Sequence, residues 1–163
     1  MGIIPGIKAL ASRDLPVNLA VSMHAARNEL RDELVPINRR YPIEDLMQAC
    51  RDYLMVKNRR ISFEWAMIAG VNDQPRDAEE LARLARQLRP SAHVNLIPLN
   101  PTPGWPTKGS SKTAVYAFAK RLEELGVNVT VRQNRGTDID AACGQLAAGQ
   151  PVVLKTRSRA ETV

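Results

Sequence analysis

The residue best suited to chemistry in this sequence is Cys143. Two acids, Asp138 and Asp140, precede it, and Ala142 and Gly144 flank it. Small neighbours leave a thiol open to a large reactant. Reactive cysteines are typically accessible thiols that lie beside positive charge. A free cysteine also packs well as a small apolar residue in a final helix. The local pattern therefore leaves a reactive and a structural interpretation open.

A second set of candidate groups lies on an alternating segment, residues 17–24. Val21 and Met23 fall on its apolar face, whereas Ser22 and His24 fall on the opposite, polar face. The functional end of a parallel α/β sheet is the end at which its strands finish. We therefore predict that Ser22 and His24 point into a polar cavity at the carboxyl end of this strand.

The next alternating segment, residues 61–68, predicts a second strand with the same division. Its apolar face holds Trp65, and its other face holds Ser62 and Glu64. Glu64 should thus face the same cavity as Ser22. A single glutamate on a strand is more often paired with a neighbouring arginine than catalytic.

Helical spacing and capping residues predict the elements between the strands. A helix opens at Pro42 and places Cys50 on its apolar stripe, so Cys50 is expected in the core. Asn72-Asp73 is expected to cap a later helix. The remaining elements are a helix from Pro5, a strand over 93–99 followed by Asn100, a helix capped by Ser110 or Ser111, and a strand over 127–132.

The alternation of short strands with helices predicts an α/β fold with a mainly parallel sheet. About four strands and a leading helix are too few to close a barrel, so the pattern indicates part of a larger one. Between the first two strands, residues 25–41 hold Arg27, Arg31, Arg39 and Arg40. This charged segment is either a substrate-contacting loop or a solvated helix and turn.

Composition sets the broad class. The chain has 163 residues, 44% of them hydrophobic and 25% charged, and its net charge of +6 favours a polyanionic partner such as nucleic acid. An aromatic content of 4% argues against base stacking as the main mode of RNA capture. The two cysteines form no CxxC or Cys/His cluster, so no metal site is expected. No apolar run approaches the ~18 residues of a membrane span, and we expect a cytoplasmic protein.

Three stretches of the sequence together resemble the C-terminal portion of the radical S-adenosylmethionine RNA methyltransferases of the RlmN type. They are VSMHA at 21–25 with RD at 31–32 and VPIN at 35–38, NLIPLNP at 95–101, and RGTDIDAACGQL at 135–146. The last stretch is the most specific. The resemblance implies the C-terminal part of a partial (β/α)6 radical SAM barrel over residues 1–150, followed by a basic, disordered tail at 151–163.

The resemblance also implies a function, methylation of carbon 2 of adenine in 23S ribosomal RNA and in transfer RNA. Cys143 would become S-methylcysteine by accepting a methyl group from one S-adenosylmethionine. Reductive cleavage of a second S-adenosylmethionine molecule would give the radical that activates this methyl group. Ser22, Met23, His24 and Asn100 match positions that hold S-adenosylmethionine in the family.

The family binds a four-iron four-sulfur (4Fe-4S) cluster through a CxxxCxxC motif, which this sequence lacks. We therefore expect the chain to be a fragment that is inactive alone, with a missing N-terminal half as a possible partner. Three alternatives remain open. They are the carbon-8 methylating relative, a non-catalytic RNA-binding remnant, and a thiol hydrolase that pairs Cys143 with His24 or His93.

Overall fold

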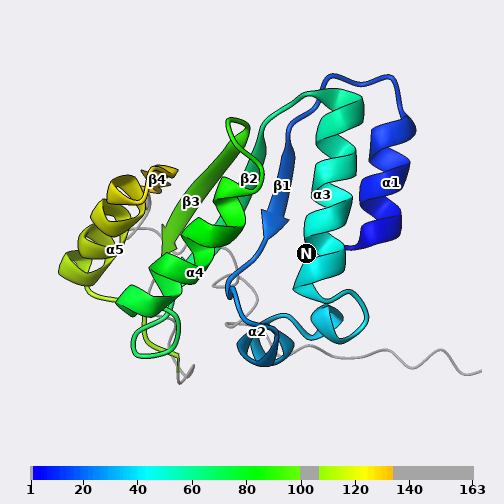
Figure 1. Cartoon of the computed structure of the whole chain (residues 1–163). Coiled ribbons are helices and arrows are strands. Elements are labelled where there is room, and N and C mark those ends of the chain that lie inside the picture. The colour runs from blue at the N-terminus through cyan, green and yellow to red at the C-terminus, as the bar shows by residue number, and fades with distance from the viewer. Residues whose placement is uncertain (1, 100–106, 134–163) are drawn as a thin grey trace, which may run out of the picture.

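The computed structural model describes residues 2–99 and 107–133, which form one sheet covered by helices (Figure 1). The strands lie in the order β1-β2-β3-β4, and every neighbouring pair is parallel. This confirms the predicted α/β fold with four parallel strands and flanking helices. In chain order the elements are α1 (Ile4–Ser12), β1 (Leu19–Ser22), α2 (Asn28–Leu34), the 3-10 helix η1 (Pro36–Arg39), α3 (Ile43–Lys57), β2 (Ile61–Met67), α4 (Pro75–Arg86), β3 (Ala92–Pro98), α5 (Lys112–Glu124) and β4 (Asn128–Val131).

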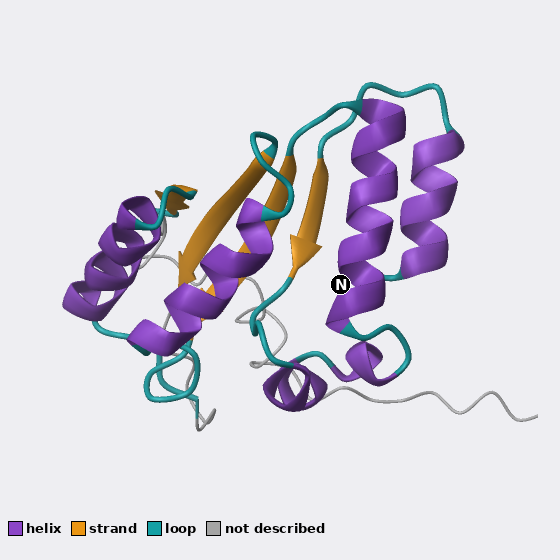
Figure 2. Ribbon diagram, in the orientation of Figure 1, coloured by secondary structure: helices purple, strands orange, loops and turns teal. Residues whose placement is uncertain are grey.

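The sheet has one apolar and one polar face. Along β2 every second residue is buried and the residues between are half-buried, and β3 follows the same pattern over most of its length. Successive side chains of a strand point to opposite faces, so the buried set lies on one face only. These residues form one hydrophobic cluster with the buried residues of α3, α4 and α5. Figure 2 shows α4 in front of the sheet, running roughly along the strands, with α5 on one side and α3 and α1 on the other.

Large side chains from β2 organise this cluster. Phe63 and Trp65 have no exposed surface, and the Trp65 ring lies 6.0 Å from that of Phe118 on α5. The indole Nε1 donates to the Asn72 carbonyl over 3.1 Å, so the polar atom of the indole is satisfied inside the core. Cys50 of α3 belongs to the same cluster and has no exposed surface, which confirms its predicted core position.

The predicted Asn72-Asp73 cap of α4 is wrong. Gln74 is the N-cap residue, and Asp77 completes a reciprocal capping box with it. Asn72 does not cap the helix because its side-chain amide bonds to backbone groups at the ends of two strands. The predicted cap of α5 is confirmed at Ser111, whose hydroxyl accepts a hydrogen bond from a backbone amide of the first turn.

The charged segment at 25–41 forms α2 and η1 rather than an open loop. Of the two alternatives, the helix and turn is therefore correct. One side chain of this segment is nevertheless buried, although the whole segment was expected to be solvated. Arg31 has no exposed surface and donates to the carbonyls of Ser22 and Met23, where β1 ends. A buried guanidinium thus ties this segment to the sheet.

Two of the predicted site residues, Asn100 and Cys143, lie outside the described residues, as does the predicted tail at 151–163. Within the described sheet, β1 is an edge strand that pairs only with β2. None of the helices in residues 2–99 and 107–133 combines the length and the apolarity needed to cross a membrane.

Truncating Trp65 should destabilise the fold strongly. We expect Trp65→Ala to lower the free energy of unfolding by about 3–5 kcal/mol, because it removes the ring packed on Phe118 and leaves a cavity. Chemical denaturation followed by circular dichroism measures this. Tyr116→Ala on α5 is the control, since Tyr116 is 64% exposed and its truncation should cost less than about 0.5 kcal/mol. Equal losses in the two variants would contradict the core described above.

Candidate functional site

The polar face of the sheet carries a row of four polar side chains, one from each strand. Ser22, Glu64, Asn95 and Thr130 are register partners. The Asn95 amide donates to the Glu64 carboxylate, with 2.7 Å between Nδ2 and Oε2. The common face predicted for Ser22 and Glu64 is thus confirmed, whereas the partner of Glu64 is an amide rather than an arginine.

Two residues earlier on the strands, the same face carries Ser62 on β2 and His93 on β3. The His93 ring bridges hydroxyls of the strands on either side, with 3.3 Å from Nδ1 to Ser62 Oγ and 2.8 Å from Nε2 to Thr130 Oγ1. Both ring nitrogens are engaged, so His93 links β2, β3 and β4 across this face. Desolvation by burial, and then the charge of Arg60, lower the pKa of His93, which favours the neutral ring at pH 7.

The hydrogen-bond ladder between β1 and β2 stops at Met23. The Met23 amide still donates to the Glu64 carbonyl over 3.0 Å. A continued parallel ladder would next pair the Ala66 amide with the Met23 carbonyl. Instead, the Ala66 amide donates to the His24 ring, with 3.0 Å between N and Nδ1. The imidazole therefore replaces a backbone carbonyl as the acceptor beyond the end of the strand.

This arrangement requires an unusual backbone at His24, whose φ of 55° lies in the left-handed region. Asn72 holds that conformation. Its Nδ2 donates to the carbonyls of His24 and Ala66, both over 2.8 Å, and its Oδ1 accepts from the Ile68 amide, also over 2.8 Å. Asn72 has no exposed surface, so its amide is satisfied entirely within the protein. These bonds, rather than strand alternation, set the direction of the His24 ring.

The His24 ring is neutral and has a defined tautomer. Desolvation by burial, followed by the nearby charge of Arg31, lowers its pKa to about 4. Because Nδ1 accepts a hydrogen bond from the Ala66 amide, the proton of the neutral ring lies on Nε2. His24 therefore offers a neutral Nε2–H donor. Its basic nitrogen is already occupied, which argues against His24 as the general base of a thiol hydrolase.

We call the end of β1, with Ser22, His24 and the neighbouring Glu64, the polar corner of the sheet. Met23 contributes to this corner differently from Ser22 and His24. Its side chain packs in the core cluster, and the residue as a whole has no exposed surface. Its amide donates to the Glu64 carbonyl, and its carbonyl accepts from Arg31 and from the Ala25 amide. Sequence reasoning missed the parts that Arg31 and Asn72 play in building the corner. Neither an arginine in a charged helix nor an asparagine before a helix carries a local signal that it is buried against a strand end.

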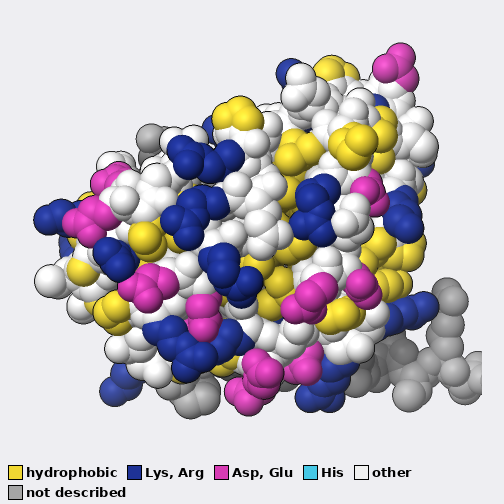
Figure 3. Space-filling view, in the orientation of Figure 1, with side chains coloured by type: hydrophobic (Ala, Val, Ile, Leu, Met, Phe, Trp, Pro, Cys, Tyr) yellow, Lys and Arg dark blue, Asp and Glu magenta, His cyan; other side chains and the backbone are white. Residues whose placement is uncertain are grey.

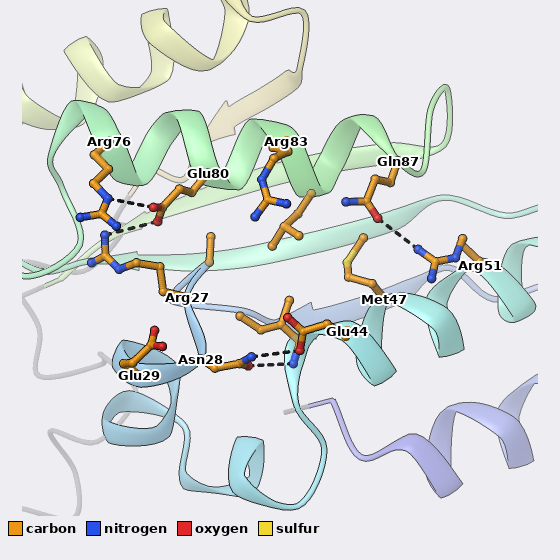
Figure 4. A pocket seen from close by; sticks show the side chains of 13 residues that line it. Arg27, Asn28, Glu29, Glu44, Met47, Arg51, Arg76, Glu80, Arg83 and Gln87 are labelled. Carbon is orange, nitrogen blue, oxygen red and sulfur yellow. Dashed lines mark hydrogen bonds and ion pairs between the residues drawn. The ribbon is translucent and has the colours of Figure 1, made fainter.

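A hollow of about 440 Å³ lies on the helix side of the molecule between α3 and α4 (Figure 4). At one end Glu80 pairs with Arg76 over 2.8 Å and with Arg27 over 3.3 Å, and elsewhere Arg51 donates to Gln87. Figure 3 shows Lys and Arg side chains interleaved with Asp and Glu over this side of the molecule. Ion pairs with Glu80 engage Arg27 and Arg76, and Arg51 is bound to Gln87. The polar corner of the sheet, where His24 presents a donor, is the better candidate site.

Similar proteins place this chain in a family, although no protein-family model matches it. It is 52% identical over 153 residues to the Moorella thermoacetica protein named "Probable dual-specificity RNA methyltransferase RlmN", an alignment that covers 94% of this chain and 43% of that protein. The relative of the same name from Pelotomaculum thermopropionicum is 54% identical over 145 residues, or 89% of this chain and 39% of that protein. The chain thus spans about two fifths of the length of these relatives.

A solved structure shows the same relation. The crystal structure of a radical SAM methyltransferase from Sphaerobacter thermophilus matches with a TM-score of 0.83 and 51% identity, over 88% of this chain and 42% of that one. The chain is an RlmN-type C-terminal portion. A domain of pyruvate-formate lyase-activating enzyme from Bacteroides vulgatus, 14% identical, shares the fold alone, with a TM-score of 0.62 over 79% of this chain and 74% of that one. These neighbours confirm the predicted partial α/β barrel.

The iron–sulfur cluster that an RlmN-type enzyme implies does not fit the residues of this chain. Such clusters are held by cysteine thiolates, and the sequence has two cysteines. Cys50 is buried, and desolvation raises the pKa of its thiol to about 12, so it carries no thiolate at neutral pH. Within the described residues no group of three or more His, Cys, Asp or Glu side chains could hold a metal ion. The chain therefore does not supply a set of cluster ligands.

The neutral His24 should make the stability of this RlmN-type chain depend on pH. Its pKa is about 4 in the folded chain against 6.5 in the unfolded chain. As the pH falls from 6.5 towards 4, the unfolded state therefore binds a proton that the native state does not. The free energy of unfolding should decrease across this window, by at most about 1.4 kcal/mol per pH unit, whereas above it His24 contributes no slope.

The matched variant for this measurement is His24→Asn. Asparagine tolerates the left-handed backbone, and its side-chain oxygen accepts a hydrogen bond without titrating. Urea denaturation across the same pH window should show a shallower loss of stability in His24→Asn than in the wild type. Identical pH profiles for the two proteins would rule out a neutral, buried His24.

Cys50 should resist thiol reagents in the folded RlmN-type chain. The rise of its pKa from 9.0 to about 12 lowers the thiolate fraction about a thousandfold, and burial blocks access as well. In a Cys143→Ser variant, which leaves Cys50 as the sole thiol, we expect alkylation to be at least ~100-fold slower than in the same variant unfolded in urea. Mass spectrometry over time measures both rates, and comparable rates would contradict the core position of Cys50.

Proposed function

We propose that this chain supplies the S-adenosylmethionine-binding and methyl-carrying part of an RNA methyltransferase. The whole enzyme would methylate carbon 2 of adenine in 23S ribosomal RNA and in transfer RNA. The polar corner at the end of β1 carries the proposal. Ser22 shares the polar face of the sheet with the paired Glu64 carboxylate, and the His24 donor follows two residues after Ser22. Relatives about half identical to this chain, named as RNA methyltransferases, support it further.

The residues of this corner suit S-adenosylmethionine by their chemistry. That ligand has carboxylate and ribose oxygens that accept hydrogen bonds, and ammonium and hydroxyl groups that donate them. The Nε2–H of His24 would donate, the Ser22 hydroxyl would donate or accept, and the Glu64 carboxylate would accept. Asn100 would contribute through its amide, and the fully buried Met23 would shape the corner without exposing a group of its own. When bound, the ligand supplies an electrophilic methyl group on sulfur.

Cys143 is the proposed methyl carrier. Its thiol would lose a proton to solvent, and the electron pair of the resulting thiolate would form the carbon–sulfur bond of S-methylcysteine. The bond between the methyl group and the sulfonium would break in the same step, and S-adenosylhomocysteine would leave. The match of residues 135–146 to the family supports this role.

RNA and the remainder of an RlmN-type enzyme are the proposed partners. A net charge of +6 favours a polyanionic partner, because cationic side chains that neutralise phosphates release counterions. The chain would act with a segment that provides the CxxxCxxC motif, in the cytoplasm. In this proposal residues 1–150 form the core and residues 151–163 a basic tail.

Co-expression with such a segment tests the proposal. We expect this chain, produced together with the N-terminal portion of the Moorella thermoacetica relative, to carry S-methylcysteine at position 143. Host RNA that lacks the modification should gain 2-methyladenosine. Mass spectrometry of peptides and of digested RNA measures both products.

Two cysteine variants serve as controls in the same co-expression. Cys143→Ala should lower both products by at least ~100-fold, because no other thiol replaces the methyl carrier. Cys50→Ala should retain them, since Cys50 is buried in the core. The appearance of 8-methyladenosine, or of 2-methyladenosine with Cys143→Ala, would contradict the proposed function.

A further inference from the structure

The end of β1 is held by the buried guanidinium of Arg31 in α2. Its Nη2 donates to the Ser22 carbonyl over 3.1 Å, and its Nε donates to the Met23 carbonyl over 3.2 Å. Successive carbonyls of a regular strand point in opposite directions, so one planar group reaches both only where the chain turns. Arg31 therefore stabilises the turn at Met23, where the backbone that follows β1 moves away from β2.

That turn removes the ladder acceptor of the Ala66 amide. The Met23 carbonyl is taken by Arg31 and by the Ala25 amide, the latter over 2.7 Å. The Ala66 amide bonds to Nδ1 of His24 instead. An amide left unpaired inside a protein is costly, so the displaced carbonyl favours the imidazole in its place.

Arg31 is itself held by a chain of amide side chains. Its Nη1 donates to Asn38 Oδ1 over 2.8 Å, and Asn38 is 1% exposed. The Asn38 Nδ2 donates in turn to side-chain oxygens of Asn28, over 3.1 Å, and of Asp32, over 2.6 Å. The same oxygen of Asn28 accepts from the amide of Ile43, over 3.0 Å. Residues of α2, η1 and α3 thus determine where the guanidinium lies.

We infer that Arg31 and Asn72 are positioning residues, which hold His24 as a neutral Nε2–H donor for an oxygen acceptor of the methyl-donor ligand. The inference rests on the function proposed above. Arg31 turns the Met23 carbonyl away from β2, and Asn72 holds the left-handed backbone of His24 through its carbonyl. Both bonds are needed to place Nδ1 against the Ala66 amide. Neither positioning residue has to touch the ligand.

The tautomer of His24 gives a test that is independent of ligand binding. Long-range nitrogen–proton NMR spectra of the full chain distinguish a bare Nδ1 from a protonated one. In the wild type we expect one species, with the proton on Nε2. In Arg31→Lys the compact ammonium cannot hold both carbonyls as the planar fork does. We expect a mixture of tautomers in this variant, together with about tenfold weaker binding of S-adenosylmethionine by calorimetry.

Arg27→Lys is the matched control, because it makes the same substitution in the same connection. Arg27 pairs with Asp77 and Glu80 on α4, over 3.2 and 3.3 Å, so its guanidinium is directed at α4 rather than at the carbonyls of Ser22 and Met23. This variant should keep both the single tautomer and the affinity of the wild type. A change equal to that of Arg31→Lys would overturn the inference.

Asn72→Ser tests the second positioning residue and serves where Arg31→Lys does not fold. It should also give mixed tautomers and weaker binding. A single Nε2–H tautomer with unchanged affinity in either folded variant would overturn the inference, as would a proton on Nδ1 in the wild-type chain. A third outcome separates the two ideas. If the wild type shows the expected tautomer and the variants lose it, the positioning of His24 by these residues stands. If, in the same samples, neither the wild type nor any variant binds S-adenosylmethionine, the proposed function fails.

Discussion

Where a strand leaves its neighbour inside a protein, the backbone groups left behind need new hydrogen-bond partners. At the end of β1 side chains meet that need. The His24 ring accepts from the Ala66 amide, and Asn72 donates to the carbonyls of His24 and Ala66. Arg31 donates to the carbonyls of Ser22 and Met23, which precede His24. The tautomer of His24 depends on these bonds. In the proposed function, the contacts that complete the fold therefore also prepare the polar corner for its ligand.

The two cysteines of this RlmN-type chain have contrasting assignments. Cys50 lies in the core, where desolvation raises the pKa of its thiol to about 12 and keeps it unreactive. Cys143 belongs to the stretch that most specifically matches the family, and the proposed function requires its thiolate. A protein that uses one thiol as a methyl carrier benefits when its other thiol does not compete for the same electrophile.

Most of the fold could be predicted because its signals are local. Alternation distinguished the faces of Ser22 and Met23, and helical spacing placed Cys50 in the core. The corner was harder because its bonds join residues far apart in the sequence, such as Asn72 with His24. The wrong cap of α4 has the same origin, since Asn72 is a good capping residue by type but its amide is bound elsewhere. Arg31 had every local sign of a solvated charge, and only the tertiary structure shows that it is buried.

The division of β2 into buried and half-buried positions has a practical consequence. Phe63 and Trp65 maintain folding, while Ser62 and Glu64, at the alternate positions of the strand, face the polar side and lie outside the hydrophobic cluster. A laboratory evolution library limited to the second set would search new ligand preferences with little loss of expression. The strand is in this sense already divided into a scaffold and a variable surface.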